Sequence, residues 1–151
     1  MKKLLVSFIS LFALFTSCKK DAPFDPAKQA IIDDGLIQNY IKTNNITAIK
    51  DVSGLYYQVI TAGTGAYPTI NSTVNVNYTG KLLNGTVFDS GNINYALQNL
   101  IKGWQIGIPY INKGGRILLI IPSALGYGNS SPGGAIPANA VLVFTVDLLG
   151  F

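Results

Sequence analysis

The side chains that could do chemistry in this chain centre on one carboxylate among aromatic and aliphatic residues. In the stretch VFDSGNINYALQNLIKGW, residues 87–104, Asp89 precedes the turn formers Ser90 and Gly91, and the stretch ends on the only Trp, Trp104. These neighbours predict that Asp89 lies where a strand ends and a loop begins. A lone acid among apolar rings suits the shaping of a pocket rather than proton transfer. Capping of the turn with Ser90 is the alternative role for Asp89.

The composition excludes several kinds of active site. The chain has no His and one Cys, so the usual zinc and transition-metal sites and the His-dependent nucleophiles lack their residues. We therefore expect no metal and no cofactor. Only 12% of the residues are charged, and the basic residues from residue 54 onward are scattered. A nucleic-acid partner is not expected, because it requires a basic patch or stripe.

The N-terminus has the layout of a bacterial lipoprotein signal peptide, predicted over residues 1–17. A basic start precedes an apolar run at residues 4–15, shorter than the ~20 residues of a spanning helix. Thr16 and Ser17 precede Cys18, which resembles a lipobox and predicts Cys18 as the lipidated residue. The expected location is the bacterial cell envelope, with a lipid anchor in the membrane and either the periplasmic or the surface face open. An uncleaved anchor with an incidental Cys18 is the alternative.

A tether, residues 18–25, and a helix with a linker, residues 26–52, follow the predicted signal. Asp25 is placed to cap the helix and Pro26 to occupy its first turn. Five apolar residues recur at helical spacing and are predicted to form one stripe: Ile32, Leu36, Ile37, Tyr40 and Ile41. We expect this stripe to dock on the domain that follows, while a homodimer through the helix is left open.

Residues 53–151 are predicted to form one domain of class α+β. The segments GLYYQVI and TVNVNYTG alternate as half-buried strands do, and RILLIIP and AVLVFTVDLLGF complete the set of strands. Ile101, Trp104 and Ile108 have helical spacing, although Gly103, Gly107 and Pro109 interrupt it. The two glycines and the proline disfavour a helix by an amount on the order of several kcal/mol. A short helix can therefore form here only if the packing of Trp104 and its neighbours compensates. The expected fold is a twisted antiparallel sheet wrapped around this helix.

Five motifs, in order and at matching spacing, resemble the FKBP-type peptidyl-prolyl cis-trans isomerases. They are VNYTGKLLNGTVFDS, LIKGW, INKGGR, IPSALGYG and IPANAVLVFTVDLL, in a region from about residue 54 to the C-terminus. The resemblance implies an FKBP-like fold and an isomerase that rotates X-Pro bonds in exported protein clients. It also implies proline-containing polypeptides as partners and a macrolide as a further ligand.

The resemblance also implies the residues of the pocket. The residues carried over to the reacting site are Tyr78, Phe88, Asp89, Ile101, Trp104, Tyr127 and Phe144, and the further substrate-binding residues are Leu100, Ile136, Ile93 and Tyr95. Trp104 would form the floor, Tyr127 would place a hydroxyl at the rim, and the Ile101 backbone N–H would bind a carbonyl of the client. Ile93 stands where an aromatic residue is common in the family, which bears on substrate preference.

Elementary chemistry explains how such a pocket could act without an acid, a base or a metal. The imide C–N bond has partial double-bond character, which gives a rotation barrier of about 18–20 kcal/mol. Water stabilises the planar, charge-separated form, so an apolar aromatic pocket favours the twisted form over the planar one. A non-catalytic module that binds proline segments, or a chaperone on the same fold, is the alternative function.

Overall fold

The computed structural model describes residues 23–151. Its helices and its antiparallel strands confirm the predicted α+β class. The predicted signal peptide, Cys18 and most of the tether lie outside the described residues. Six strands form one antiparallel sheet in the order β1-β2-β5-β6-β3-β4. They are β1 (Ile49–Lys50), β2 (Tyr56–Thr61), β3 (Thr73–Leu82), β4 (Val87–Ala96), β5 (Arg116–Ile121) and β6 (Leu142–Gly150).

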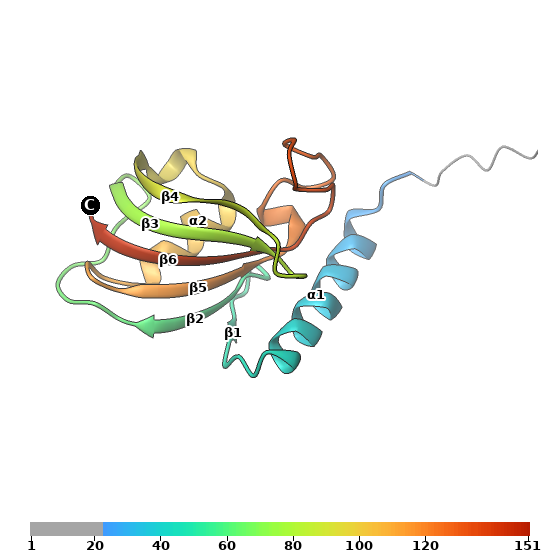
Figure 1. Cartoon of the computed structure of the whole chain (residues 1–151), viewed down its shortest axis with the longest axis horizontal. Coiled ribbons are helices and arrows are strands. Elements are labelled where there is room, and N and C mark those ends of the chain that lie inside the picture. The colour runs from blue at the N-terminus through green and yellow to red at the C-terminus, as the bar shows by residue number, and fades with distance from the viewer. Residues whose placement is uncertain (1–22) are drawn as a thin grey trace, which may run out of the picture.

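Helices lie within the curve of this sheet and beyond one end of its strands (Figure 1). They are α1 (Pro26–Thr43), α2 (Lys102–Gly107) and the short 3₁₀ turns η1 (Leu97–Asn99), η2 (Ile108–Tyr110) and η3 (Ser123–Leu125). The twisted sheet curves around α2, whereas α1 lies outside the sheet at one end of the strands (Figure 1). The predicted sheet around one short helix is therefore confirmed. Among the helices of residues 23–151, none is both long and apolar enough to cross a membrane.

The two glycines of α2 allow this helix to lie directly on the sheet. A Cβ on Gly103 would approach Ile121 side-chain atoms at 2.6 Å, and a Cβ on Gly107 would collide with Leu119. Both glycines are buried, and Trp104 between them belongs to the main hydrophobic core. The helical propensity lost at these glycines is thus offset by close packing of α2 on β5, the compensation that the sequence required.

Strand β4 corrects the predicted end of a strand at Asp89. The strand runs from Val87 to Ala96 and pairs with β3 along its length, so Asp89 lies inside it. Gly80 faces Asp89 and Lys81 faces Val87, which leaves Phe88 as the extra residue of a β-bulge. Polar residues and a glycine in this stretch concealed the strand, because their β propensity is low and the pairing is decided by the neighbouring strand.

Helix α1 begins as its sequence predicts. The Asp25 carboxylate accepts hydrogen bonds from the backbone N–H groups of Ala27 at 3.0 Å and Lys28 at 3.2 Å, and Pro26 occupies the first turn. The helix ends at Thr43 with Asn44 as its C-cap, and Asn45 follows with a φ of 53°, a conformation that Asn tolerates better than most residues. Both ends of the helix are therefore fixed by local chemistry.

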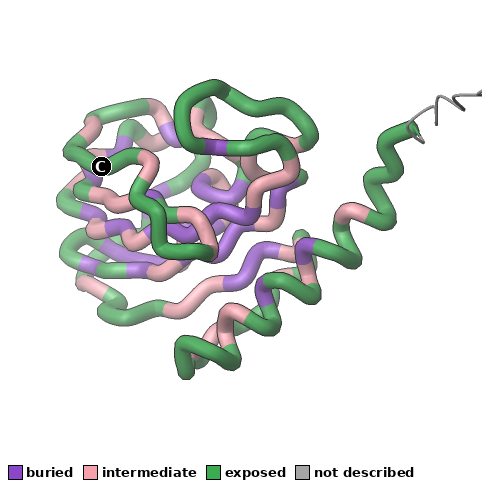
Figure 2. Tube along the Cα trace, turned by 45° about the vertical axis from the view of Figure 1, so that its right-hand side comes forward, coloured by how far each residue is buried: buried purple, intermediate pink, exposed green. Residues whose placement is uncertain are grey.

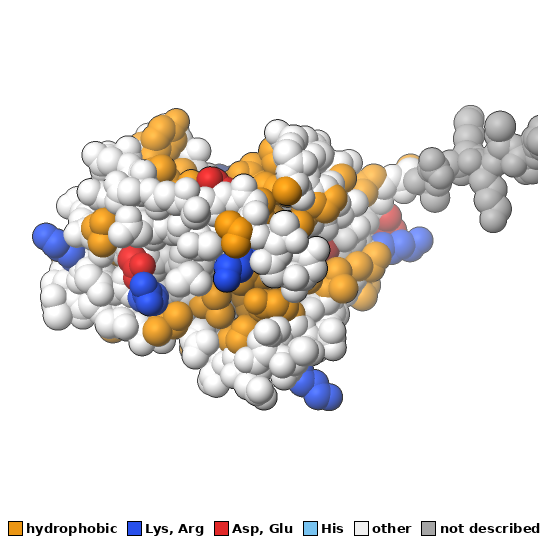
Figure 3. Space-filling model, viewed as in Figure 1, with side chains coloured by type: hydrophobic (Ala, Val, Ile, Leu, Met, Phe, Trp, Pro, Cys, Tyr) orange, Lys and Arg blue, Asp and Glu red, His pale blue; other side chains and the backbone are white. Residues whose placement is uncertain are grey.

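The face of α1 that docks on the domain differs from the predicted apolar stripe. Ile37 is fully buried, and Tyr40 and Ile41 pack partly against the same cluster, which also contains Tyr56, Ile120, Val141 and Val143. Ile32 and Leu36, however, remain 53% and 46% exposed. Figure 2 shows the buried positions of α1 on the side that faces the rest of the domain, and Figure 3 shows apolar side chains exposed on the surface near α1. The predicted stripe was wrong at these two positions because the face of α1 that docks on the domain includes a carboxylate, the buried Asp33.

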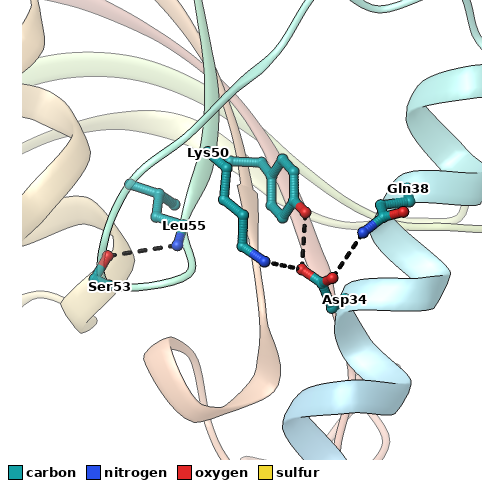
Figure 4. Close-up of polar contacts among 6 residues, drawn as sticks. Asp34, Gln38, Lys50, Ser53 and Leu55 are labelled. Carbon is teal, nitrogen blue, oxygen red and sulfur yellow. Dashed lines mark hydrogen bonds and ion pairs between the residues drawn. The ribbon is translucent and has the colours of Figure 1, made fainter.

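The carboxylate of Asp34 connects α1 to the first two strands (Figure 4). It accepts hydrogen bonds from the Tyr56 hydroxyl at 2.8 Å and the Gln38 amide at 2.7 Å, and it pairs with the Lys50 ammonium. The hydrogen bond from Lys50, followed by that from Tyr56, lowers the pKa of Asp34 below its usual value. An ion pair this exposed contributes little by itself, so the buried apolar contact at Ile37 holds the helix in place.

We predict that Ile37→Ala lowers the free energy of unfolding by about 2–4 kcal/mol, because it removes a fully buried side chain. Urea unfolding measures the loss. Ile31→Ala on the same helix is the matched control, since Ile31 is 75% exposed; its effect should stay within about 0.5 kcal/mol. Equal losses in the two variants would show that α1 is not docked through Ile37.

Candidate functional site

Three aromatic rings from three elements enclose a small hollow on the concave side of the sheet. Tyr78 comes from β3, Trp104 from α2 and Phe144 from β6. The hollow has a volume of about 100 Å³ and is lined by Tyr78, Asp89, Ile93, Leu100, Ile101, Trp104, Tyr127 and Phe144. This volume is several times the ~10–15 Å³ that one water needs, so it accommodates a group the size of a small ring.

The rings meet edge to face. The ring centroids of Trp104 and Phe144 are 5.2 Å apart at an interplanar angle of 90°, and those of Tyr78 and Trp104 are 5.3 Å apart at 79°. This arrangement is the preferred one for aromatic pairs. Trp104 and Phe144 are only 3% and 4% exposed, so the floor of the hollow is an apolar surface withdrawn from water.

Gly80 and the bulge in β4 allow two neighbouring residues to serve the same site. A Cβ on Gly80 would lie 2.7 Å from ring atoms of both Phe88 and Phe144, which excludes any larger residue there. Phe88 packs edge to face on Phe144, with centroids 5.5 Å apart, while the next residue, Asp89, lines the hollow. Adjacent residues of a regular strand point to opposite faces, so the bulge is what brings both to this site.

The Tyr78 hydroxyl donates a hydrogen bond of 2.7 Å to the Asp89 carboxylate. Partial burial, and secondly this hydrogen bond, raise the pKa of Tyr78 from 10.0 to about 12. The hydroxyl therefore stays protonated at all physiological pH values and holds the carboxylate in one place. Asp89 and Ser90 lie inside β4, and among the described residues the Asp89 carboxylate accepts no hydrogen bond from Ser90, so the turn-capping alternative is wrong.

The backbone at the edge of the hollow presents a free donor. The Ile101 N–H makes no hydrogen bond within residues 23–151, while the Ile101 carbonyl accepts from the Trp104 N–H at 2.9 Å and so starts α2. The Gln105 amide donates to the carbonyls of Leu100, at 2.7 Å, and Gln98, at 2.9 Å. These bonds fix the segment before Ile101 and leave its N–H available to a ligand carbonyl.

Tyr127 closes the hollow from the rim. It follows η3 and lines the hollow while 40% of its surface remains exposed. Figure 1 shows the long loop between β5 and β6, which contains Tyr127, standing beside the end of the sheet and above α1. The exposed ring is thus carried by a turn rather than by the rigid sheet.

Three of the expected residues lie outside the lining of the hollow. Phe88 supports Phe144 from behind. Ile136 is 8% exposed and packs in the main core, and its carbonyl accepts a hydrogen bond of 2.6 Å from the Ser131 hydroxyl. Tyr95 is 51% exposed on β4, two residues beyond Ile93. All the other expected residues line the hollow together.

A larger hollow of about 360 Å³ lies between α1 and two turns, around Ser53–Gly54 and Pro122–Leu125. It contains no aromatic residue, and its walls include the carboxylates of Asp33 and Asp34. The smaller hollow is the better candidate because its rings, free donor and fixed carboxylate converge on one point. Residues 23–151 contain no group of three or more acidic, His or Cys residues that could hold a metal ion.

Sequence reasoning missed two residues that shape the site. The motif YTG places Gly80 inside a predicted strand, and a glycine in a strand is a signal of close approach by another part of the chain. Gln105 carried no signal, because its role depends on carbonyls that only the folded chain brings near. Neither residue lines the hollow: Gly80 leaves room for the rings of Phe88 and Phe144, and Gln105 binds backbone carbonyls beside it.

A sequence-family model described as FKBP-type peptidyl-prolyl cis-trans isomerase matches residues 65–149. A protein of Haemophilus influenzae named probable FKBP-type peptidyl-prolyl cis-trans isomerase is 43% identical over 109 residues, covering 66% of this chain and 45% of the relative. FkpA of Escherichia coli (strain K12), an FKBP-type isomerase by name, is 44% identical over 102 residues, covering 64% and 37%. The chain thus spans less than half the length of these two relatives.

Solved structures show the same arrangement. The crystal structure of FkpA from Escherichia coli superposes with a TM-score of 0.70 at 36% identity, over 82% of this chain and 61% of that one. A peptidyl-prolyl cis-trans isomerase from Pseudomonas syringae superposes with a TM-score of 0.69 at 26% identity, over 85% of this chain and 98% of that one.

The raised pKa of Tyr78 gives a prediction that isolates Asp89. Between pH 9 and 11, spectra of ¹³C-labelled tyrosine should show that Tyr78 is still protonated in the wild-type protein. In the Asp89→Asn variant the pKa of Tyr78 should fall but stay above 10.0, because the Tyr78 side chain remains partly buried. Tyr110, whose pKa is also about 12 because it binds Asp51, should not change and serves as the control. The stabilisation linked to Tyr78 is complete below pH 10.0 and is lost as the pH rises through about 12. If the pKa of Tyr78 were the same in Asp89→Asn as in the wild-type protein, the hydrogen bond from Tyr78 to Asp89 would be contradicted.

Proposed function

The chain belongs to the FKBP-type peptidyl-prolyl cis-trans isomerase family, and from this membership we propose that it accelerates rotation about X-Pro bonds in polypeptide clients. The observation that carries the proposal is the shared hollow of Tyr78, Trp104 and Phe144, with the Ile101 N–H free at its edge. Exported proteins are the proposed clients. Uncatalysed rotation takes tens to hundreds of seconds, slow enough to limit folding.

The reaction follows from what the hollow excludes. A proline ring seated on Trp104 and Phe144 loses its water on the apolar floor, and the Ile101 N–H can bind one carbonyl of the client. The carbonyl of the rotating imide then lacks the solvation that stabilises the planar form, so the twisted form is favoured relative to it. Each tenfold acceleration needs about 1.4 kcal/mol of such preference. No bond is made or broken, and no proton moves.

Asp89 supplies a fixed charge rather than a proton. Its carboxylate is held by Tyr78 at the side of the hollow, where aromatic ring edges carry partial positive charge. A carboxylate in this place orients the rings and sets the potential at the twisting amide. Because the interaction requires a positioned charge, an uncharged replacement should weaken catalysis even if the hollow keeps its shape.

A proline-limited refolding assay tests the function. Wild-type protein at micromolar concentration should accelerate the slow phase, and Asp89→Ala should reduce kcat/KM by about tenfold, as expected for the loss of one charge-assisted hydrogen bond. Asp147→Ala is the control, because Asp147 binds Arg116 and does not line the hollow. Binding of a proline peptide without acceleration by wild-type protein would leave the alternative, a non-catalytic binding or chaperone module.

Two further partners belong to the proposal. A macrolide is proposed as a ligand of the same hollow, since its lining is apolar and aromatic with one free donor. A homodimer through α1 is supported by apolar side chains left exposed on and beside that helix: Phe24, Ile31, Ile32 and Leu36. Obligate interfaces are rich in such residues.

We also propose that Cys18 carries a lipid anchor that holds the protein at a membrane of the bacterial cell envelope. The support is the sequence alone: a basic start, an apolar run and two small residues before the only Cys. Each buried methylene of an acyl chain contributes about 0.8 kcal/mol to membrane binding.

Cys18→Ala should move the protein out of the membrane fraction and abolish labelling by a fatty-acid analogue. Quantitative fractionation of cells expressing wild type or variant measures this. Asp25→Ala, which alters the start of α1 but leaves Cys18 intact, should stay in the membrane fraction. A Cys18→Ala protein that remains membrane-bound would favour the uncleaved anchor instead.

A further inference from the structure

The buried carboxylate of Asp33 does not line the proposed pocket, yet both of its oxygens accept hydrogen bonds. Asp33 is 1% exposed. One of its oxygens accepts hydrogen bonds from the Ser123 backbone N–H, at 2.8 Å, and the Ser123 hydroxyl, at 2.6 Å; the other accepts from the Gln29 amide at 2.7 Å. A buried carboxylate is costly unless donors satisfy it, so this contact between α1 and η3 is specific.

Ser123 also makes hydrogen bonds to the turn that contains Tyr127. Its carbonyl accepts hydrogen bonds from the N–H groups of Gly126, at 2.9 Å, and Gly128, at 2.8 Å. Tyr127 stands between these two glycines. Gly128 has a φ of 64°, which turns the chain back, and its own carbonyl accepts from the Asn139 N–H at 2.8 Å. Asp33 therefore binds the N–H and hydroxyl of Ser123, and the Ser123 carbonyl binds the N–H groups of both glycines that flank Tyr127.

We propose that Asp33 is a positioning residue of the isomerase site: through Ser123, α1 fixes the place of Tyr127 at the rim of the pocket. The inference rests on the proposed function and extends it beyond residues 65–149, which the family model matches. It assigns to α1 a part in client binding in addition to its place in the fold. Because Tyr127 sits on a turn, its position depends on such external contacts more than that of Trp104 or Phe144 does.

The neighbouring Asp34 provides a matched control. Both carboxylates lie on α1, but Asp34 binds Tyr56 and Lys50 and thereby holds α1 to β1 and β2 (Figure 4). It makes no hydrogen bond to η3 or to the Tyr127 turn. The change of Asp to Asn keeps the shape of the side chain and removes its charge in both variants. A difference in effect between the two variants therefore comes from the different partners of the two carboxylates.

The first test is a double-mutant cycle with Tyr127→Ala, read as kcat/KM in the proline-limited refolding assay. Asp33→Asn alone should lower kcat/KM by about five- to tenfold, since it weakens a charge-assisted hydrogen bond that positions the rim. In the Tyr127→Ala background the same change should cost less than about twofold, because the group it positions is gone. Asp34→Asn should leave kcat/KM unchanged in both backgrounds.

Equal losses from Asp33→Asn with and without Tyr127 would overturn the proposal, since a general loss of stability acts in both backgrounds. Thermal unfolding of every variant shows which of them are folded at the assay temperature. Ser123→Ala keeps the backbone N–H and removes only the hydroxyl, so it provides a milder variant if Asp33→Asn does not fold; the same non-additivity with Tyr127→Ala is expected of it.

The second test does not depend on activity. Amide hydrogen exchange at Gly126 and Gly128 should accelerate in Asp33→Asn and in Ser123→Ala, and should stay at the wild-type rate in Asp34→Asn. Unchanged exchange at both glycines in Asp33→Asn would refute the link from α1 to the turn. If the wild-type protein shows no isomerase activity while exchange responds as expected, the proposed function fails and the structural link to Tyr127 stands.

Discussion

The contact between the rings of Trp104 and Phe144 is the constraint on which the rest of the site depends. At a centroid distance of 5.2 Å and an angle of 90°, these rings form the floor of the hollow, and each comes from a different element. To bring them together, α2 must lie on β5 at a distance that only Gly103 and Gly107 allow. Gly80 is required for the same reason on the other side of Phe144. Three glycines that weaken their own elements are thus explained by one aromatic contact.

The lining of the hollow contains one ionised side chain, Asp89, as the same requirement for an apolar floor leads one to expect. A site proposed to act by excluding water gains nothing from ionisable groups on its floor, and the chain lacks His altogether. The carboxylates nearest to function are used for position instead. Asp89 is fixed by the Tyr78 hydroxyl at 2.7 Å, and Asp33 is buried against Ser123. In both cases a charge is useful because it orders donors around it, which keeps flexible segments in one conformation.

Local chemistry explains which parts of the fold could be predicted. The capping of α1 by Asp25 and the alternation at the start of β3 depend on neighbours in sequence, and the structure confirms both. Strand β2 also forms, but its burial does not alternate, because its second half is exposed. The part of strand β4 beyond Asp89 was missed because its polar residues have weak β propensity, and β3 alone decides the pairing. The stripe on α1 was wrong at Ile32 and Leu36, since periodicity does not show which of two overlapping faces meets the sheet. Asp33, a charged residue, occupies the docked face because Ser123 donates to it.

The sequence by itself determined the class of the fold, the identity of the pocket residues that recur in the family motifs, and the absence of acid–base chemistry based on His. These properties depend on residue types and on spacing along the chain. Tertiary structure alone decided that Phe88 and Asp89 serve one site through a bulge, that Gln105 fixes the segment before Ile101, and that α1 reaches Tyr127. The physical reason is that hydrogen bonds and close contacts between distant segments depend on distances of a few tenths of an ångström, which only the packed chain defines.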